Sequence, residues 1–327
     1  MSHAAAFVSV LAVAGVIGGA LLTMLGLFAE KWPALELANQ GRPLVLIGSV
    51  AVLGLALILS DGALTAAAIL LLIANVGLFV LGLQGAASLG RPESRRFVRM
   101  VTFNVWHDNA RVEDVAAVLT EADADLIVLQ EVTSQRRSRL HDLTKMRYPH
   151  ILGSSGLLIL AKHPVCVSGH IDGQVDRSAS HGRARGPLLL WARFEVDGFA
   201  FELVGVHLTY PFKPLEQAVD TRALIAFVRS RKAPLIVAGD YNLTPWSLKL
   251  QRFTRETGLL RTNTFHLTWP MRRVIPLLPL VSIDNVFTSS EFAPLAVTAG
   301  PSAGSDHRPI IVDIALTRPD SMSKVPL

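Results

Sequence analysis

The hydrophobic positions divide the 327-residue chain into two parts at about residue 90. The first part contains three apolar stretches without charged side chains, at 4–29, 43–60 and 62–83. A helix that spans a bilayer needs roughly 20 apolar residues. The pattern therefore predicts a transmembrane region over residues 1–90, with helices at about 5–28, 43–60 and 62–83.

After residue 96, short apolar runs alternate with amphipathic stretches, which is typical of a globular domain. Many strand candidates follow one another without an intervening helix, which favours two packed sheets over a doubly wound parallel sheet. We therefore predict an α+β fold, a four-layer α/β/β/α sandwich, over residues 97–316. Residues 91–96 are expected to form a linker and residues 317–327 a tail. Strands are expected at 98–105, 125–129, 156–160, 188–196, 199–207, 234–238, 282–287 and 309–316, and helices at 112–122, 134–145, 215–230 and 246–257.

The distribution of charge supports this division. Only five charged side chains occur in residues 1–90, although the chain has 31 Lys+Arg and 26 Asp+Glu. This excludes a simple soluble enzyme, a disordered protein and a collagen-like fibre. The single cysteine, Cys166, excludes an internal disulfide framework. The formal net charge of +5 is a modest positive balance, which fits a phosphate-bearing substrate or an anionic membrane surface without choosing between them.

The first apolar stretch has a signal peptide as its alternative reading, but it lacks a positive n-region and is long for an h-region. Asn75, inside the third stretch, is expected to form a hydrogen bond with a neighbouring helix. We expect an integral, multi-pass protein of the cell inner or plasma membrane. Arginines at 91–99 favour a cytoplasmic catalytic domain, but this signal rests on few residues and leaves the side undecided.

Several predicted strands end in polar residues that an apolar strand does not need for packing. Polar groups at strand ends converge on one rim of a sandwich, where the scaffold holds them rigidly. Each residue alone also fits a structural role, such as a strand-end cap, an Asx turn or a buried core histidine. The residues are Asn104, Glu131, His207, Asp240, Asn242, Asp284, Asp306 and His307.

Carboxylates and amides dominate this set, and it contains no cysteine. Hard oxygen ligands suit Mg²⁺, with Mn²⁺ as an alternative, whereas a zinc site would more often use histidine and cysteine. Such a set is typical of the metal-assisted attack of water on a phosphate ester.

Seven short motifs follow one another along the globular part: TFNVW (102–106), LQEV (129–132), GLLILAKHP (156–164), VHL (206–208), GDYN (239–242), IDNVF (283–287) and SDHRP (305–309). In this order they resemble the motifs of the endonuclease/exonuclease/phosphatase superfamily. That group includes DNase I-like nucleases, abasic-site endonucleases, inositol polyphosphate 5-phosphatases and neutral sphingomyelinases. The resemblance covers about residues 97–316. One motif alone is weak, whereas seven in order are specific.

The resemblance implies a role for each residue at the metal and the water. Glu131 would be the main metal ligand, with Asn104 contacting metal or phosphate and Asp306 near the metal. Asp240 would orient or deprotonate the attacking water, and Asn242 would steady the transition state.

The resemblance also implies which residues bind the phosphate. His307, held by Asp284, would bind the oxygen that gains charge, and His207 would be a second donor on that side. Lys162 keeps a positive charge where family members often have the arginine of GxAILSR. Lys162 and Arg185 are therefore expected as substrate contacts, although solvated loop positions explain Arg185 about as well.

The segment MRRVIPLLPLV (271–281) precedes Asp284 and is strongly apolar. It fits either a loop packed on the domain or a segment that dips into the bilayer with its arginines at the headgroups. Replacing its two central leucines by serine would separate the two readings.

Together these features favour a membrane-anchored phosphoesterase that uses Mg²⁺ to hydrolyse a phosphate mono- or diester, with a membrane lipid phosphate as the expected substrate. The alternative is a membrane-tethered endo- or exonuclease acting on DNA or RNA, which would need a basic groove. A binding module that has lost catalysis is a third reading, and the intact set of polar residues argues against it. The sequence indicates no protein partner.

Overall fold

The computed structural model describes residues 3–84, 87, 97–176, 183–263, 265–271 and 281–316, with the backbone alone for 174–176 and 183–185. Its contacts group into two compact units. The first contains the chain up to Gln84 together with Pro211–Leu215 and Thr244–Arg252, and the second contains the rest. Two short stretches of the expected catalytic domain therefore pack with the N-terminal helices. The expected linker 91–96 and tail 317–327 lie outside the described residues.

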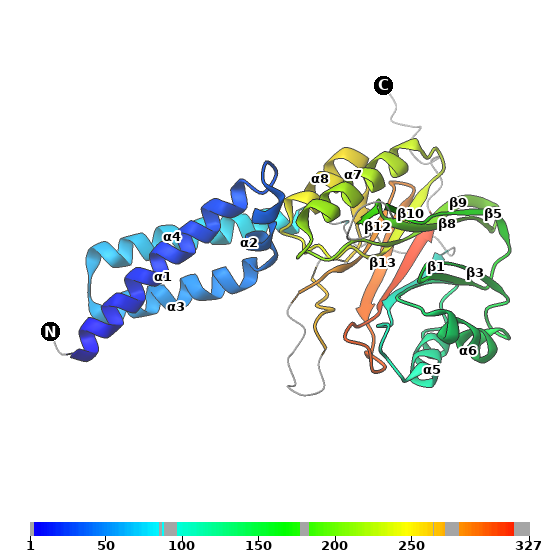
Figure 1. Cartoon of the computed structure of the whole chain (residues 1–327), viewed down its shortest axis with the longest axis horizontal. Helices are drawn as coiled ribbons and strands as arrows, with labels where there is room; N and C mark the ends of the chain where they lie inside the picture. Colours follow the sequence, from blue (N-terminus) through cyan, green and yellow to red (C-terminus); the bar gives the residue numbers. More distant parts are fainter. Residues whose placement is uncertain are drawn as a thin grey trace, which may run out of the picture. The chain divides into compact units, whose positions relative to one another are not determined.

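Three long helices, α1 (His3–Leu27), α3 (Arg42–Leu59) and α4 (Gly62–Leu83), lie side by side in the first unit (Figure 1). They contain 25, 18 and 22 residues and are apolar enough to cross a membrane. Many of their large apolar side chains are exposed, which suits a lipid environment better than water. The prediction of three span-length helices is confirmed. The short helices η1 (Pro33–Leu35) and α2 (Glu36–Gln40) connect α1 to α3.

A buried polar cluster joins these helices. Asn75 Oδ1 accepts hydrogen bonds from Arg42 Nη1 at 3.1 Å and from Thr23 Oγ1 at 3.2 Å. Arg42 Nη2 also donates to Asn39 Oδ1. The expected hydrogen bond between Asn75 and neighbouring helices is confirmed. Each buried polar group of the cluster thus has a partner, as packing in an apolar medium requires.

The second unit is built on two six-stranded sheets, with the orders β13-β14-β1-β2-β4-β3 and β11-β12-β10-β9-β8-β5. The strands of the first sheet are β1 (Phe97–Asn104), β2 (Leu126–Gln130), β3 (His150–Ser154), β4 (Leu157–Ala161), β13 (Phe292–Ala299) and β14 (Ile310–Leu316). Those of the second are β5 (Val165–Ile171), β8 (Leu188–Val196), β9 (Phe199–His207), β10 (Leu235–Asp240), β11 (Leu260–Arg261) and β12 (Asp284–Thr288). A separate pair joins β6 (Gln174–Asp176) to β7 (Arg183–Arg185).

The two sheets face each other across a shared apolar core, in which Val128 of the first sheet belongs to the same cluster as Phe201 of the second. Helices α5 (Val112–Ala122) and α6 (Ser134–Thr144) pack on the outer face of the first sheet (Figure 1). Helices α7 (Pro214–Ser230) and α8 (Leu248–Thr257) lie beside the second sheet, where Phe253 of α8 contacts Phe287 of β12. The predicted α/β/β/α sandwich is confirmed.

The strands that the sequence pattern missed are mostly at sheet edges. β13 and β3 are the edges of the first sheet, and β5 is an edge of the second. Most of β5 is exposed, and β13 contains Pro294. Edge strands lack the continuous apolar run of a strand that is covered on both faces. The sequence signal for a strand is therefore weak in them.

Candidate active site

Strand pairing brings the predicted residues to one rim of the sandwich. In the first sheet β1 runs parallel to β2, so Asn104 ends beside the residue that precedes Glu131. In the second sheet β9 runs parallel to β10 and places His207 opposite Asp240. The antiparallel neighbour β12 places Asp284 opposite Asp240 from the other side. The carboxyl ends of β1, β2, β9 and β10 and the amino end of β12 thus supply the site.

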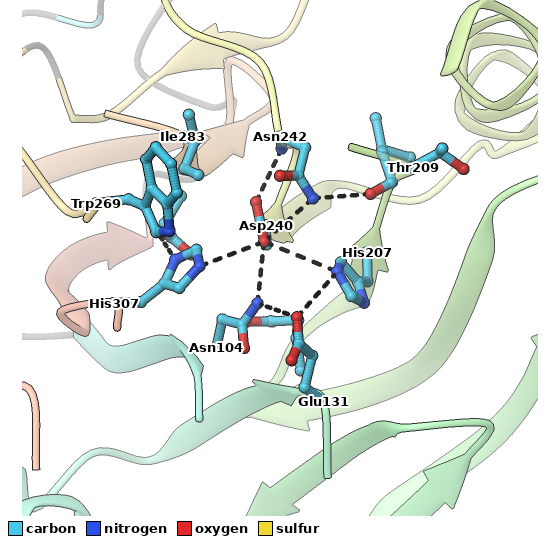
Figure 2. A network of polar contacts seen from close by, with 12 residues as sticks. Asn104, Glu131, His207, Thr209, Asp240, Asn242, Trp269, Ile283 and His307 are labelled. Atoms are coloured by element: carbon cyan, nitrogen blue, oxygen red, sulfur yellow. Dashed lines mark hydrogen bonds and ion pairs between the residues drawn. The ribbon is translucent and has the colours of Figure 1, made fainter. Parts of the chain in front are cut away.

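Asn104 bridges two carboxylates that come from different sheets. Its amide nitrogen donates to Glu131 Oε1 and to Asp240 Oδ2, both at 3.0 Å (Figure 2). Its amide oxygen accepts from the backbone N–H of Trp106 at 3.0 Å. Asn104 is fully buried, and its two hydrogen bonds fix the separation of the two carboxylates. The amide nitrogen of Asn104 faces these acids, so Asn104 positions Glu131 in this arrangement. Because an amide nitrogen does not ligate a metal ion, this orientation does not provide the expected direct contact of Asn104 with the metal.

His307 and Asp284 form a buried pair. The Nδ1–H of His307 donates to Asp284 Oδ2 at 2.8 Å. Burial alone would lower the pKa of His307, but the negative charges of Asp284 and Asp240 raise it to about 10. The ring is therefore an imidazolium at neutral pH. Its Nε2 lies 3.9 Å from Asp240 Oδ2, which leaves the Nε2 proton available to a ligand oxygen (Figure 2).

Asp240 lies at the centre of the site and is buried. Burial and the nearby charge of Asp284 raise the pKa of Asp240 above its usual range, while His307 opposes this rise. The backbone N–H of Asn242 donates to Asp240 Oδ1 at 2.8 Å. A carboxylate with a raised pKa is suited to take a proton from water.

Gly239 allows β10 to approach β9 closely just before Asp240. Its φ is +154°, and a Cβ atom there would lie 1.9 Å from the carbonyl oxygen of Val206. No other residue fits this position without moving the backbone. The glycine of the GDYN motif is thereby explained by packing.

Glu131 adopts a left-handed backbone conformation with φ of 60° at the end of β2. Its Oε2 accepts hydrogen bonds from His107 N at 2.9 Å and from His107 Nδ1 at 2.7 Å. Burial would raise the pKa of Glu131, but the hydrogen bonds from Asn104 and His107 lower it to about 2. Glu131 is therefore a permanent anion. The unusual φ of a non-glycine residue is typical of a constrained functional position.

His207 faces both acids from β9. Its Nε2 lies 3.8 Å from Glu131 Oε1 and 3.8 Å from Asp240 Oδ2 (Figure 2). These distances exceed a hydrogen bond, so His207 Nε2 is hydrogen-bonded to neither acid. The structure thus gathers His207 with the other predicted residues.

Helix α7 supplies support that the sequence analysis missed. Gln217 Nε2 donates to the carbonyl oxygens of Asn242 at 3.0 Å and Thr209 at 2.9 Å. Asp220 Oδ2 accepts from Thr209 N at 3.0 Å and from its hydroxyl at 2.6 Å. Both polar side chains are on the buried face of α7. Polar residues on the apolar side of an amphipathic helix were the available signal.

Asp306 belongs to the loop before β14, which is tied to the rim. Trp269 Nε1 donates to Asp306 Oδ2 at 3.2 Å. The hydroxyl of Ser305 donates to the carbonyl oxygen of Asn104 at 2.7 Å. The side chain of Asp306 is 29% exposed, so it is accessible beside the buried acids.

Of the two expected substrate contacts, the structure describes the side chain of Lys162, which is not part of this cluster. Lys162 Nζ contacts Asp123 Oδ1 at 2.6 Å and the Asp123 carbonyl oxygen at 2.8 Å. Because β4 runs antiparallel to β2, its end lies beside the beginning of β2, at the opposite edge from Glu131. A substrate contact through Lys162 does not fit this position. The side chain of Arg185 and most of the apolar segment, 272–280, lie outside the described residues.

Among the described residues, one group of donor atoms lies close enough together to hold a metal ion. Donor atoms of Asp240, Asp284 and His307 lie within 4.8 Å of one another. However, the imidazolium of His307 uses Nδ1 for Asp284, so a cation is disfavoured among these three. Glu131 and Asp306 instead offer partly exposed oxygens next to the network. Oxygen donors of this kind fit a divalent ion such as Mg²⁺.

The matched family model is the Endonuclease/Exonuclease/phosphatase family, over residues 101–307. The chain belongs to this family. It is therefore a metal-dependent hydrolase of phosphoric ester bonds, as the family resemblance of the seven motifs implied. No curated protein matches the sequence.

Solved structures with the same fold include an endonuclease/exonuclease/phosphatase from Beutenbergia cavernae, with 21% identity, a TM-score of 0.56 and coverage of 68% of this chain and 72% of that one. Sphingomyelinase C from Streptomyces griseocarneus has 16% identity, a TM-score of 0.52 and coverage of 67% of this chain and 99% of that one. TDP2 from D. rerio, complexed with single-strand DNA product, has 18% identity, a TM-score of 0.53 and coverage of 67% and 98%.

Proposed function

We propose that the chain is a membrane-anchored, Mg²⁺-dependent phosphoesterase that hydrolyses a phosphate mono- or diester of a membrane lipid. The observation that carries the proposal is the combination, in one chain, of the Glu131–Asn104–Asp240–His307 site with three span-length helices. These helices would cross the cell inner or plasma membrane.

Each site residue has a chemical task in this proposal. Glu131 and Asp306 would hold the metal ion, which would neutralise charge on the phosphoryl oxygens when bound. Asp240 accepts a hydrogen bond from the attacking water and takes its proton. His307 donates its Nε2 proton to the phosphate oxygen that gains charge, and Asn242 holds Asp240. Donors fixed before the reaction stabilise such developing charge without reorganisation.

His207 completes the phosphate side. Its Nε2 lies 3.8 Å from Glu131 Oε1 and from Asp240 Oδ2, beyond hydrogen-bond distance, so an N–H there would be able to donate to a phosphate oxygen. The two histidines approach Asp240 from opposite sides in Figure 2.

The loop after His207 supports a lipid-borne substrate. Pro211–Leu215 packs in the unit of the apolar helices. Phe212 is 75% exposed and Leu215 is 68% exposed, with Lys213 between them. Exposed apolar side chains next to a lysine are typical of a membrane interface. Sphingomyelinase C, named above, is a lipid hydrolase with this fold.

A panel assay tests the proposal. The full chain in detergent with Mg²⁺ is incubated with a set of lipid phosphates and phosphodiesters and, separately, with plasmid DNA. We expect lipid turnover that EDTA abolishes and that added Mg²⁺ restores. DNA nicking without lipid turnover would replace this proposal by the nuclease, which the fold of TDP2 with its DNA product favours as second candidate.

A further inference from the structure

The chain passes directly from the site residues into the unit of the apolar helices. Asp240 and Asn242 belong to the second unit, and Thr244 begins a stretch that belongs to the first. Leu243, which connects them, is fully buried. The backbone that follows Asp240 and Asn242 thus continues directly into a stretch that packs with the apolar helices.

Two side chains of α2 bind the backbone of this stretch. The backbone N–H of Thr244 donates to Gln40 Oε1 at 2.8 Å. The N–H of Leu248, at the start of α8, donates to Glu36 Oε1 at 2.9 Å. Glu36 is 1% exposed. A carboxylate at the first N–H groups of a helix satisfies donors that the helix itself leaves unpaired.

Helix α4 holds the same stretch by a tryptophan. The ring of Trp246 stacks on Phe79, with ring centroids 4.8 Å apart. Its Nε1–H donates to the carbonyl oxygen of Phe79 at 3.0 Å. Gly82, one turn further along α4, makes room for the ring, because a Cβ atom there would lie 2.3 Å from Trp246 Cδ1. Trp246 is buried as a result.

We infer that the helical anchor is a positioning element of the active site, because Glu36, Gln40 and the Gly82–Trp246 contact hold the backbone that follows Asp240 and Asn242. This inference rests on the roles proposed above for those two residues. It predicts that the anchor raises the rate of ester hydrolysis even when no membrane substrate is involved. A tether that only concentrates the enzyme at a surface would not do so.

The test compares two identical changes in one helix. Gly82→Ala places a methyl group against Trp246, whereas Gly77→Ala, also in α4, meets no atom within 4 Å. Alanine favours a helix over glycine by about 1 kcal/mol, so neither change is expected to break α4. Both variants of the full chain are assayed in detergent with Mg²⁺ and the soluble phosphodiester bis(p-nitrophenyl) phosphate.

We expect Gly82→Ala to lower kcat by about tenfold or more with little change in KM, because small misplacements of catalytic groups are costly. Gly77→Ala should match the unaltered chain. Amide hydrogen exchange of the peptide covering residues 238–246 is measured on the same samples and should be faster only in Gly82→Ala. Equal kcat and equal exchange in the two variants would overturn the inference.

The exchange readout separates this inference from the proposed function. If the unaltered chain does not hydrolyse the ester, the proposed function fails in this assay, and the exchange comparison still decides whether the anchor orders the backbone. If Gly82→Ala also lowers the melting temperature, Glu36→Gln and Glu36→Leu replace it. Glutamine keeps the oxygen that accepts from Leu248 N–H and should retain kcat and slow exchange, whereas leucine should lose both. Equal behaviour of these two variants would likewise overturn the inference.

Discussion

Buried polar groups occur both among the apolar helices and at the rim of the sandwich, but they are combined differently. In the helices, the guanidinium of Arg42 is satisfied by the neutral amides of Asn39 and Asn75. At the rim, three acids and two histidines lie together, and Asp240 is close to Asp284. Gathering like charges in a buried place is unfavourable and serves no packing purpose. The comparison teaches that a buried cluster whose polar groups satisfy one another stabilises the fold, whereas a buried cluster of like charges indicates a catalytic site.

The largest expected effect follows from removing a charged group at the rim. His307→Ala and Asp240→Asn should each lower kcat by about 10³-fold, because they remove a proton donor or acceptor used in the transition state. Steady-state hydrolysis by the full chain with Mg²⁺ measures the effect, and circular dichroism checks that the fold is retained. A loss below about tenfold in a folded variant would contradict the role of the rim.

A smaller effect is expected from the support behind the rim. Gln217→Leu removes the donor to the carbonyl oxygens of Asn242 and Thr209 and should lower kcat by about tenfold. Val219→Ala is the matched control, since Val219 lies on the exposed side of the same helix. Identical rates for the two variants would show that α7 does not position the loops.

The polar cluster of the helices should affect stability and leave the chemistry unchanged. Asn75→Leu deprives Arg42 and Thr23 of a shared acceptor. Hydrogen bonds between membrane helices contribute about 0.5–2 kcal/mol, so we expect a lower melting temperature in detergent. The kcat of the folded variant should stay within about twofold of the unaltered chain. A large fall in kcat at unchanged stability would contradict the distinction between the polar cluster of the helices and the catalytic rim.

The smallest effect is expected at Lys162. Lys162→Gln removes an ion pair with Asp123 at the edge away from the rim. Because exposed ion pairs contribute little, melting temperature and kcat should both be nearly unchanged. An increase in KM for a phosphate ester would contradict this prediction and show that Lys162 contributes to substrate binding.

The sequence predicted most of the sandwich and the centre of the site. Strand ends identify rim residues because parallel strands share one edge, which placed Asn104, Glu131, His207 and Asp240 together. The motif order then supplied the pairing of His307 with Asp284. The rim residues thus follow from the local sequence pattern, and the pair of His307 with Asp284 follows from the family resemblance.

Other features could not be read from the sequence. Lys162 occupies a motif position, yet strand direction sends it to the opposite edge. The contacts of Gln40 with Thr244 and of Phe79 with Trp246 join residues more than 160 positions apart. No periodicity encodes such pairs, because each partner looks like an ordinary residue of its own element.

The central claim is that the enzyme acts on lipids at the bilayer surface, and the most direct test compares the same headgroup ester on a membrane lipid and on a water-soluble molecule. The kcat/KM of the full chain is measured on a vesicle-borne lipid phosphate and on a short-chain, water-soluble ester with the same headgroup, for the unaltered chain and for a variant with both Phe212→Ser and Leu215→Ser. We predict Mg²⁺-dependent turnover of both substrates, and a loss on vesicles alone in the variant. Absence of lipid turnover, or an equal loss on both substrates, would contradict an enzyme that acts on lipids at the bilayer surface.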